Sequence, residues 1–242
     1  MEKERFIELD ILRGFAISVM IFFHLLWDLD YYGLSQIDKE IYGYSAYFPT
    51  IFFILVGICL VISSKYKTTG QLIFRGMWVF GIGLIITAVT TVILPDKPIT
   101  FGVLHCIGCS IILGTFFTRF KTYNLIIAPF FILTGIFIGN FHVQDPSFFQ
   151  LAIGQHQENL WAYTVDYFPI LPWFGVTLFG LGTGNILYKN GKRQFPFPEI
   201  SHLIPVKMIS YLGKNSLVIY LLHQPMIAGT ILYIIPIINP YT

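Results

Sequence analysis

The feature that most constrains the fold is a long apolar stretch near the N-terminus that carries ionisable side chains at helical intervals. In a helix, residues at steps of three or four form one stripe down a single face. Here the stripe is made of Asp10, Arg13, Ile17, Met20, His24 and Asp28. At 1.5 Å per residue it is ~27 Å long, about the thickness of the hydrocarbon core of a bilayer. A membrane-spanning helix with charges along one face needs protein or water on that face, so the sequence predicts other helices that cover it.

Composition indicates a polytopic membrane protein. Hydrophobic residues make up 55% of the 242 positions and charged residues 12%, whereas a soluble domain carries about 25% charged residues. The net charge of +2 argues against nucleic acid as a partner. The three cysteines, Cys59, Cys106 and Cys109, lie in apolar runs and include no second pair for a metal site. We therefore expect free thiols packed as small apolar side chains.

Seven apolar segments have close to the ~20 residues that cross a bilayer. They are residues 11–29, 45–63, 74–94, 100–118, 123–141, 169–188 and 215–238. We predict an all-α polytopic membrane protein with about seven transmembrane helices, forming one domain over residues 1–242. Residues 142–166 are expected either to cover the outer mouth or to form a plain solvated loop, and residues 204–212 are expected to form a short interfacial helix.

Basic residues are distributed very unevenly between the two sides of this arrangement. With a cytoplasmic N-terminus, thirteen of the fifteen basic residues lie on the inner side, and only Lys39 and Lys97 lie outside. The inner set is Lys3, Arg5, Arg13, Lys65, Lys67, Arg75, Arg119, Lys121, Lys189, Lys192, Arg193, Lys207 and Lys214. This asymmetry follows the positive-inside rule and predicts a multi-pass protein of the plasma membrane with its N-terminus in the cytoplasm.

Three histidines within the apolar segments are candidates for chemistry. His24 and Asp28 are four residues apart, so the carboxylate is expected to orient the imidazole as a general base. The alternative is a polar pair that holds helices together. His105 lies early in the fourth segment, and His223 precedes Pro225 in the seventh. No two of these histidines have the i, i+4 spacing of a helical zinc motif, so we expect no metal.

Other polar and small residues have both a binding and a structural interpretation. Arg13 is suited to bind a phosphate, or else pairs with Asp10 or reaches the headgroups. The segment entering the sixth helix carries aromatic side chains that also suit a membrane interface. The sequence Lys214-Asn215-Ser216 opens the seventh helix and is suited to bind an anion or to cap the helix. Gly175, Gly180, Gly182 and Gly184 indicate close helix packing.

Four motifs taken together resemble a known family. They are the stretch from Arg5 to Gly14 with His24 and Asp28, the stretch from Phe101 to His105, the stretch from Asp166 to Trp173, and the stretch from Gly213 to Ser216. In this order they resemble the prokaryotic branch of the heparan-α-glucosaminide N-acetyltransferase catalytic-domain family. The Asp-x-x-Arg-Gly opening followed by a histidine is also similar to the acyltransferase 3 family.

The resemblance implies a membrane-embedded acyltransferase. It would move an acetyl or other short acyl group from cytosolic acyl-CoA to a sugar-like acceptor at or across the membrane. Its partners would be the lipid bilayer, acetyl-CoA or another acyl-CoA, and a glycan-like acceptor, and homo-oligomerisation is left open. The expected catalytic residues are His24, Asp28 and His105; the expected acyl-CoA-binding residues are Arg13, Arg75, Lys214, Asn215 and Ser216; the expected substrate-binding residues are Asp166, Trp173 and His223.

One departure from the family concerns which histidine acts as the catalytic base. The lysosomal members have an asparagine where His24 stands and place their catalytic histidine in the loop after the first helix, whereas residues 31–44 contain no histidine here. His24 or His105 would have to take that role.

The main rival function is a small-solute or proton-coupled transporter, because intramembrane histidine and aspartate also form proton relays. Such a transporter usually has two related halves, which this sequence lacks. A third hypothesis is a non-catalytic membrane subunit whose polar stripe binds a partner helix.

Overall fold

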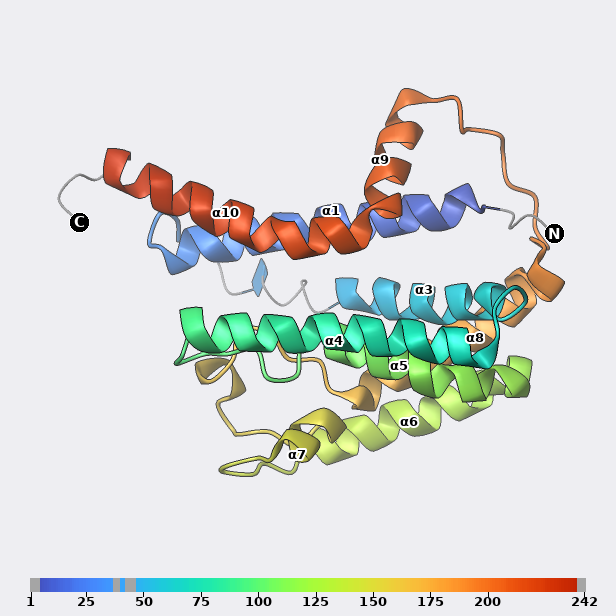
Figure 1. Ribbon diagram of the computed structural model, residues 1–242, viewed down its shortest axis with the longest axis horizontal. Helices are drawn as coiled ribbons and strands as arrows, with labels where there is room; N and C mark the ends of the chain where they lie inside the picture. Colours follow the sequence, from blue (N-terminus) through green and yellow to red (C-terminus); the bar gives the residue numbers. More distant parts are fainter. Residues whose placement is uncertain (1–4, 37–39, 42–46, 239–242) are drawn as a thin grey trace. The chain divides into compact units, whose positions relative to one another are not determined.

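The computed structural model describes residues 5–36, 40–41 and 47–238, and these residues form helices and turns without any strand (Figure 1). The helices are α1 (Ile7–Tyr31), α3 (Phe48–Ser63), α4 (Thr69–Ile93), α5 (Val103–Phe117), α6 (Asn124–Gly139), α7 (Phe148–Ile153), α8 (Ile170–Leu187), α9 (Ile204–Lys214) and α10 (Ser216–Ile238). The predicted all-α class is confirmed, and each predicted apolar segment corresponds to one helix. Helix α7 lies within residues 142–166, for which the sequence allowed either a segment that covers the outer mouth or a plain solvated loop.

Five stretches of the described chain are long and apolar enough to cross a membrane. They are α1, α4, the continuous run Val103–Gly139, α8 and the Ser216–Tyr233 part of α10, whereas α3 is a shorter apolar helix. The run Val103–Gly139 contains both α5 and α6, and the chain between them breaks at Lys121, whose φ is +47°. The membrane character of the chain is therefore confirmed, and the number of seven crossings and the orientation stay predictions.

The chain forms two compact units. The first, which we call the middle unit, is Phe53–Pro196, and the second, the terminal unit, joins Arg5–Phe52 to Phe197–Thr242. Each is described by itself below. The single domain expected over residues 1–242 stays a prediction.

In the middle unit, glycines let α8 approach a helix on either side. A Cβ atom on Gly180 would meet the carbonyl oxygen of Ile54 in α3, whereas one on Gly175 would lie 2.8 Å from the backbone nitrogen of Ile132 in α6. Gly184 faces α3 in the same way, and Gly182 faces Leu125 of α6. The prediction that these glycines serve close helix packing is confirmed. Their spacing also separates the two faces of α8, because Gly180 and Gly184 are four apart and Gly175 and Gly182 are seven apart.

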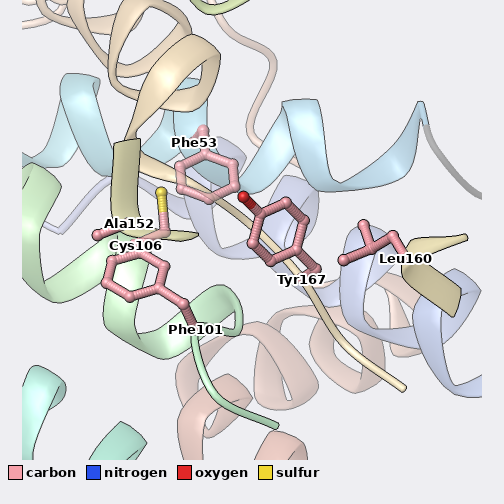
Figure 2. Close-up of a cluster of buried hydrophobic side chains, with 6 residues drawn as sticks. All are labelled: Phe53, Phe101, Cys106, Ala152, Leu160 and Tyr167. Atoms are coloured by element: carbon pink, nitrogen blue, oxygen red, sulfur yellow. The ribbon is translucent and has the colours of Figure 1, made fainter. Parts of the chain in front are cut away.

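The core of the middle unit gathers side chains from α3, α5, α7 and the connections before α5 and α8. Figure 2 shows its buried members, which are Phe53, Phe101, Cys106, Ala152, Leu160 and Tyr167. The Tyr167 hydroxyl donates a hydrogen bond to the carbonyl oxygen of Leu151 at 2.8 Å. Burial raises the pKa of the Tyr167 phenol above its usual value, and the nearby Cys106 raises it further. Tyr167 therefore stays a neutral donor that ties α7 to the segment before α8.

In the terminal unit, α9 and α10 both contact α1. The predicted polar stripe is the covered face of α1: Asp10, Ile17 and Asp28 are buried, and Arg13 and His24 are half-buried. Apolar side chains off this stripe, including Leu12, Phe15, Phe22 and Leu25, are exposed, as lipid-facing residues are in a chain of this class. The expectation that neighbouring helices cover the stripe is confirmed.

Helix α9 runs steeply across α1 near the N-terminal end of α1 (Figure 1). The crossing depends on two glycines, one in each helix. A Cβ atom on Gly14 would meet the carbonyl oxygen of Ile209, and one on Gly213 would meet the carbonyl oxygen of Asp10. Any side chain at either position would push the helices apart. The Asp-x-x-Arg-Gly motif and the Gly-Lys-Asn-Ser motif are therefore in direct contact.

Candidate functional site

Two histidines of the terminal unit face each other between α1 and α10. The ring centroids of His24 and His223 are 4.8 Å apart, and the rings are nearly perpendicular. The Nδ1 atom of His24 lies 2.9 Å from the carbonyl oxygen of Met20, and Nδ1 of His223 lies 2.6 Å from that of Tyr220. A carbonyl oxygen only accepts, so both Nδ1 atoms carry a proton and donate it. In both neutral rings the lone pair is therefore on Nε2.

Asp28, one turn further along α1, is held by α10. The amide nitrogen Nε2 of Gln224 donates to both carboxylate oxygens of Asp28, at 2.9 and 3.0 Å. The sequence predicted that Asp28 itself would orient the imidazole of His24 through their four-residue spacing. The structure differs, because the Met20 carbonyl orients His24 and Gln224 orients Asp28. Asp28 still interacts electrostatically with His24.

Two polar atoms of α10 remain unsatisfied at this place. Nε2 of His223 and Oε1 of Gln224 are buried and have no hydrogen-bond partner among the residues described. Buried polar atoms normally have a partner, and exceptions concentrate at sites where a ligand or water binds. We call His24, Asp28, His223 and Gln224 the histidine cluster. It combines two acceptor nitrogens, a carboxylate and a free amide oxygen.

A second polar group lies at the other end of the same stripe. The buried Asp10 carboxylate accepts from Arg5 Nε at 2.7 Å and from Arg13 Nη1 at 3.0 Å. The ion pair with Asp10 that the sequence allowed for Arg13 is therefore present. The Arg13 side chain as a whole is 28% exposed.

The other residues expected to bind acyl-CoA are found in different settings. Lys214 is exposed and follows Gly213, which lies against Asp10, so the lysine starts at the level of the Asp10 group. Asn215 donates from Nδ2 to the carbonyl oxygen of Tyr211 and so caps the end of α9, and Ser216 begins α10. The sequence allowed a cap at the start of the seventh helix, whereas the printed side-chain hydrogen bond of Asn215 is to the end of the preceding helix, α9. Arg75 is an exposed residue of α4 in the middle unit.

His105 is enclosed in the middle unit. It is 1% exposed and lies between the rings of Phe80 and Phe101. Its Nδ1 atom accepts from the backbone N–H of Gly102 at 3.2 Å, so Nε2 carries the proton and faces Thr87 Oγ1 at 3.4 Å. Both ring nitrogens thus have partners, and the side chain closes the first turn of α5. This arrangement favours a structural role over an acyl-carrying one.

Asp166 and Trp173 also lie around the start of α5 and the core of the middle unit. Asp166 accepts through Oδ2 from the backbone N–H of Val103 at 3.1 Å, a favourable place for a carboxylate at a helix N-terminus. Gly102 leaves room for it, because a Cβ atom there would meet the same carboxylate oxygen. Trp173 stacks on Phe53, with ring centroids 4.9 Å apart. The structure thus brings the Phe101–His105 and Asp166–Trp173 motifs together.

The connection between α6 and α8 carries a surface hollow. Its lining residues are His156, Glu158, Asn159, Leu160, Trp161 and Ala162. The Trp161 ring is largely exposed, and the His156 ring lies 5.2 Å from that of His142. An indole beside a carboxylate and an amide is a suitable surface for a hydroxyl-rich ligand.

Comparison with known proteins decides the family. Residues 5–225 match the family described as heparan-alpha-glucosaminide N-acetyltransferase, catalytic. The chain belongs to this family. It is therefore related to membrane-bound acyltransferases, and the match confirms the resemblance drawn from the four motifs. No curated protein and no solved structure matches the chain significantly, and the more distant similarity to the acyltransferase 3 family stays a prediction.

The match to the heparan-alpha-glucosaminide N-acetyltransferase family includes every residue of the histidine cluster. Sequence reasoning assigned roles to His24, Asp28 and His223 but none to Gln224. The sequence could have indicated a role for Gln224, because a glutamine inside an apolar helix and next to a histidine needs a polar partner. Of residues 31–44, which contain no histidine, positions 37–39 and 42–44 lie outside the part of the chain that the structure describes. Within the described residues, no three histidine, cysteine, aspartate or glutamate side chains are grouped to hold a metal.

Proposed function

We propose that this protein transfers an acetyl or other short acyl group from cytosolic acyl-CoA to a sugar-like acceptor at or across the plasma membrane. Membership of the acetyltransferase family supports the reaction class. The observation that carries the mechanism is the histidine cluster, because His24 keeps the lone pair of Nε2 while its Nδ1 proton is fixed on Met20. A neutral imidazole with one fixed proton and one open acceptor is suited to general base catalysis.

The reaction proceeds by proton transfer to His24. Nε2 of His24 accepts the proton of the acceptor hydroxyl or amine as that group attacks the thioester carbonyl carbon. The tetrahedral intermediate then expels the CoA thiolate, which takes the proton back from the imidazolium. Asp28, held in place by Gln224, stabilises the transient imidazolium electrostatically. His223 faces His24 and supplies a second acceptor for the reacting group.

The donor is proposed to enter from the Asp10 end of α1. Arg13 and His24 are eleven residues apart, which corresponds to ~16 Å along a helix. An extended pantetheine arm covers such a distance while its phosphates stay near Arg13. Lys214 starts at the same level, and the donor-binding role expected of Arg75, in the middle unit, stays a prediction.

The first prediction tests the base. His24→Ala should lower acyl transfer about 10²–10⁴-fold, because that is the usual contribution of a general base. The assay uses purified protein in proteoliposomes with radiolabelled acetyl-CoA and a panel of amino sugars and hexoses. His202→Ala is the matched control, since His202 is exposed and lies in the connection before α9.

The same vesicles separate the enzyme from the transporter. Label on an acceptor or on the protein supports the acyltransferase, whereas saturable solute flux without label transfer supports the transporter and overturns the proposal. Normal turnover in His24→Ala together with an inactive but folded His105→Ala would move the role to His105.

The second prediction concerns the donor. Arg13→Gln should weaken CoA binding strongly, and Arg13→Lys should restore it only in part, because lysine lacks the planar fork that pairs with phosphate. Arg5→Gln is the control: Arg5 also pairs with Asp10 but is 61% exposed at its side chain, so its loss reproduces the broken ion pair. Calorimetric titration with CoA measures the affinity. Equal affinity in wild type and Arg13→Gln would exclude Arg13 from the donor site.

A further inference from the structure

Helix α9 is covered by its own unit on one face and exposed on the opposite face. The covered face carries Ser210 and Gly213, which are buried, and it lies on α1 through the crossing at Gly14. The opposite face carries Ile204, Met208 and Tyr211, which are 73%, 66% and 66% exposed. Spacings of four and three align these three side chains in one stripe along the helix. We call this set the α9 stripe.

Basic side chains flank the α9 stripe on one edge. Lys207 and Lys214 are both exposed and lie seven residues apart, which is two turns, so they project from the same side. Helix α9 contains no acidic residue. The side of the helix opposite the lysines carries Pro205, Ile209 and Leu212. The helix thus carries apolar side chains along the α9 stripe and opposite the lysines, and a cationic edge beside the stripe, a pattern typical of helices that lie in a membrane interface.

The geometry of the terminal unit agrees with that pattern. Helix α1 is long and apolar enough to cross a membrane, and α9 crosses it steeply at the level of Asp10 to Gly14 (Figure 1). A helix that lies across a spanning helix near its end runs along the membrane surface. With 11 residues, α9 is ~16 Å long, about half the thickness of a hydrocarbon core, so it cannot span the bilayer itself.

We propose that α9 binds anionic phospholipid. The α9 stripe enters the acyl-chain region of the leaflet at the N-terminal end of α1, and Lys207 and Lys214 bind the phosphates of anionic headgroups there. Two exposed cations on a helix that has no acidic residue of its own favour a negatively charged leaflet over a zwitterionic one. Because Gly213 lies against Asp10, the bound lipid also braces the end of α1 that carries Arg13. The proposal depends on the membrane character of the chain and not on acyl transfer.

The first test measures how deep α9 lies. The full chain is labelled with a nitroxide at Met208→Cys or at Lys207→Cys and reconstituted into vesicles of phosphatidylcholine mixed with phosphatidylglycerol. The unmodified chain gives the background of the three native thiols. We expect the label at 208 to be relaxed by oxygen and protected from a water-soluble nickel reagent, and the label at 207 to show the reverse. Equal exposure of both labels to nickel would overturn the proposal, as would cross-linking of 208 to a second copy of the chain.

The second test measures lipid selectivity without any CoA present. The Lys207→Gln/Lys214→Gln double variant should lose about 10- to 30-fold in its preference for phosphatidylglycerol over phosphatidylcholine, since each headgroup-level cation contributes on the order of a factor of five. The preference is read from spin-labelled lipids at the protein surface. Lys189→Gln/Lys192→Gln is the matched control, because both lysines are exposed and lie in the middle unit. Equal loss in both double variants would show only a general charge effect and reject α9 as the site.

Discussion

A neutral histidine has one protonated and one unprotonated ring nitrogen, and in the histidine cluster the backbone fixes which nitrogen carries the proton. The carbonyl oxygens of Met20 and Tyr220 bind the Nδ1 protons of His24 and His223, so no side chain is needed for that purpose. Asp28 is free for a different task, and Gln224 keeps it in place with two hydrogen bonds. The amide of Gln224 is committed through its nitrogen, which leaves its oxygen for a ligand or water. Gln224 thus connects the Asp28 carboxylate of α1 to the two unsatisfied acceptor atoms of α10, its own Oε1 and Nε2 of His223.

The third prediction tests this link. Gln224→Leu should lower turnover and leave CoA affinity unchanged, because it removes both hydrogen bonds to Asp28 and keeps Arg13 intact. Asp28→Asn should cost less than His24→Ala, since the base remains. In a double-mutant cycle, Gln224→Leu and Asp28→Asn should be coupled by about 1.5–3 kcal/mol, the usual range for a hydrogen bond to a charged group. Independent, additive effects on kcat would contradict the Asp28–Gln224 pairing.

Single helices show which parts of the site were predictable from the sequence. The periodicity of α1 predicted the polar stripe and its coverage, because helical spacing is a local property. The spacing of His24 and Asp28 predicted the wrong hydrogen bond, because the actual partner of Asp28 is Gln224, 196 residues away along the chain. Helix α5 gives a similar case. Its histidine was a reasonable catalytic candidate by composition, but the enclosure by Phe80, Phe101 and Thr87 depends on tertiary packing.

The fourth prediction concerns the packing of α8 on α3. Gly180→Ala should destabilise the fold by about 1–3 kcal/mol, because the added Cβ would meet the carbonyl oxygen of Ile54 and the backbones would have to separate. Gly81→Ala in α4 is the matched control, since no atom lies within 4 Å of a Cβ there. It should be neutral or stabilise by up to about 1 kcal/mol through its helix propensity. Thermal unfolding followed by circular dichroism compares the two, and equal melting temperatures would contradict the close packing.

At the scale of the whole molecule, the family match and the compact units describe different things. The match runs from residue 5 to residue 225 and so takes in the middle unit and helices from both ends of the chain. The histidine cluster belongs to the terminal unit, whereas His105, Asp166 and Trp173 belong to the middle unit. The sequence motifs of the family are thus divided between the two units. Composition predicted the membrane class correctly. The orientation of the helices in the membrane stays a prediction from the charge asymmetry, because the helices alone do not define it.

The fifth prediction is that orientation. The N-terminus should be cytoplasmic, because thirteen of the fifteen basic residues then lie inside, as the positive-inside rule requires. Glu158 and Lys192 are exposed residues of two different connections, which this topology places on opposite sides of the membrane. On intact cells, Glu158→Cys should react with a membrane-impermeant thiol reagent, and Lys192→Cys should react only after the cells are opened. The unmodified chain, with thiols only in apolar helices, gives the background. Labelling of position 192 on intact cells, with position 158 protected, would reverse the orientation and move the Arg13 end of α1 away from cytosolic acyl-CoA.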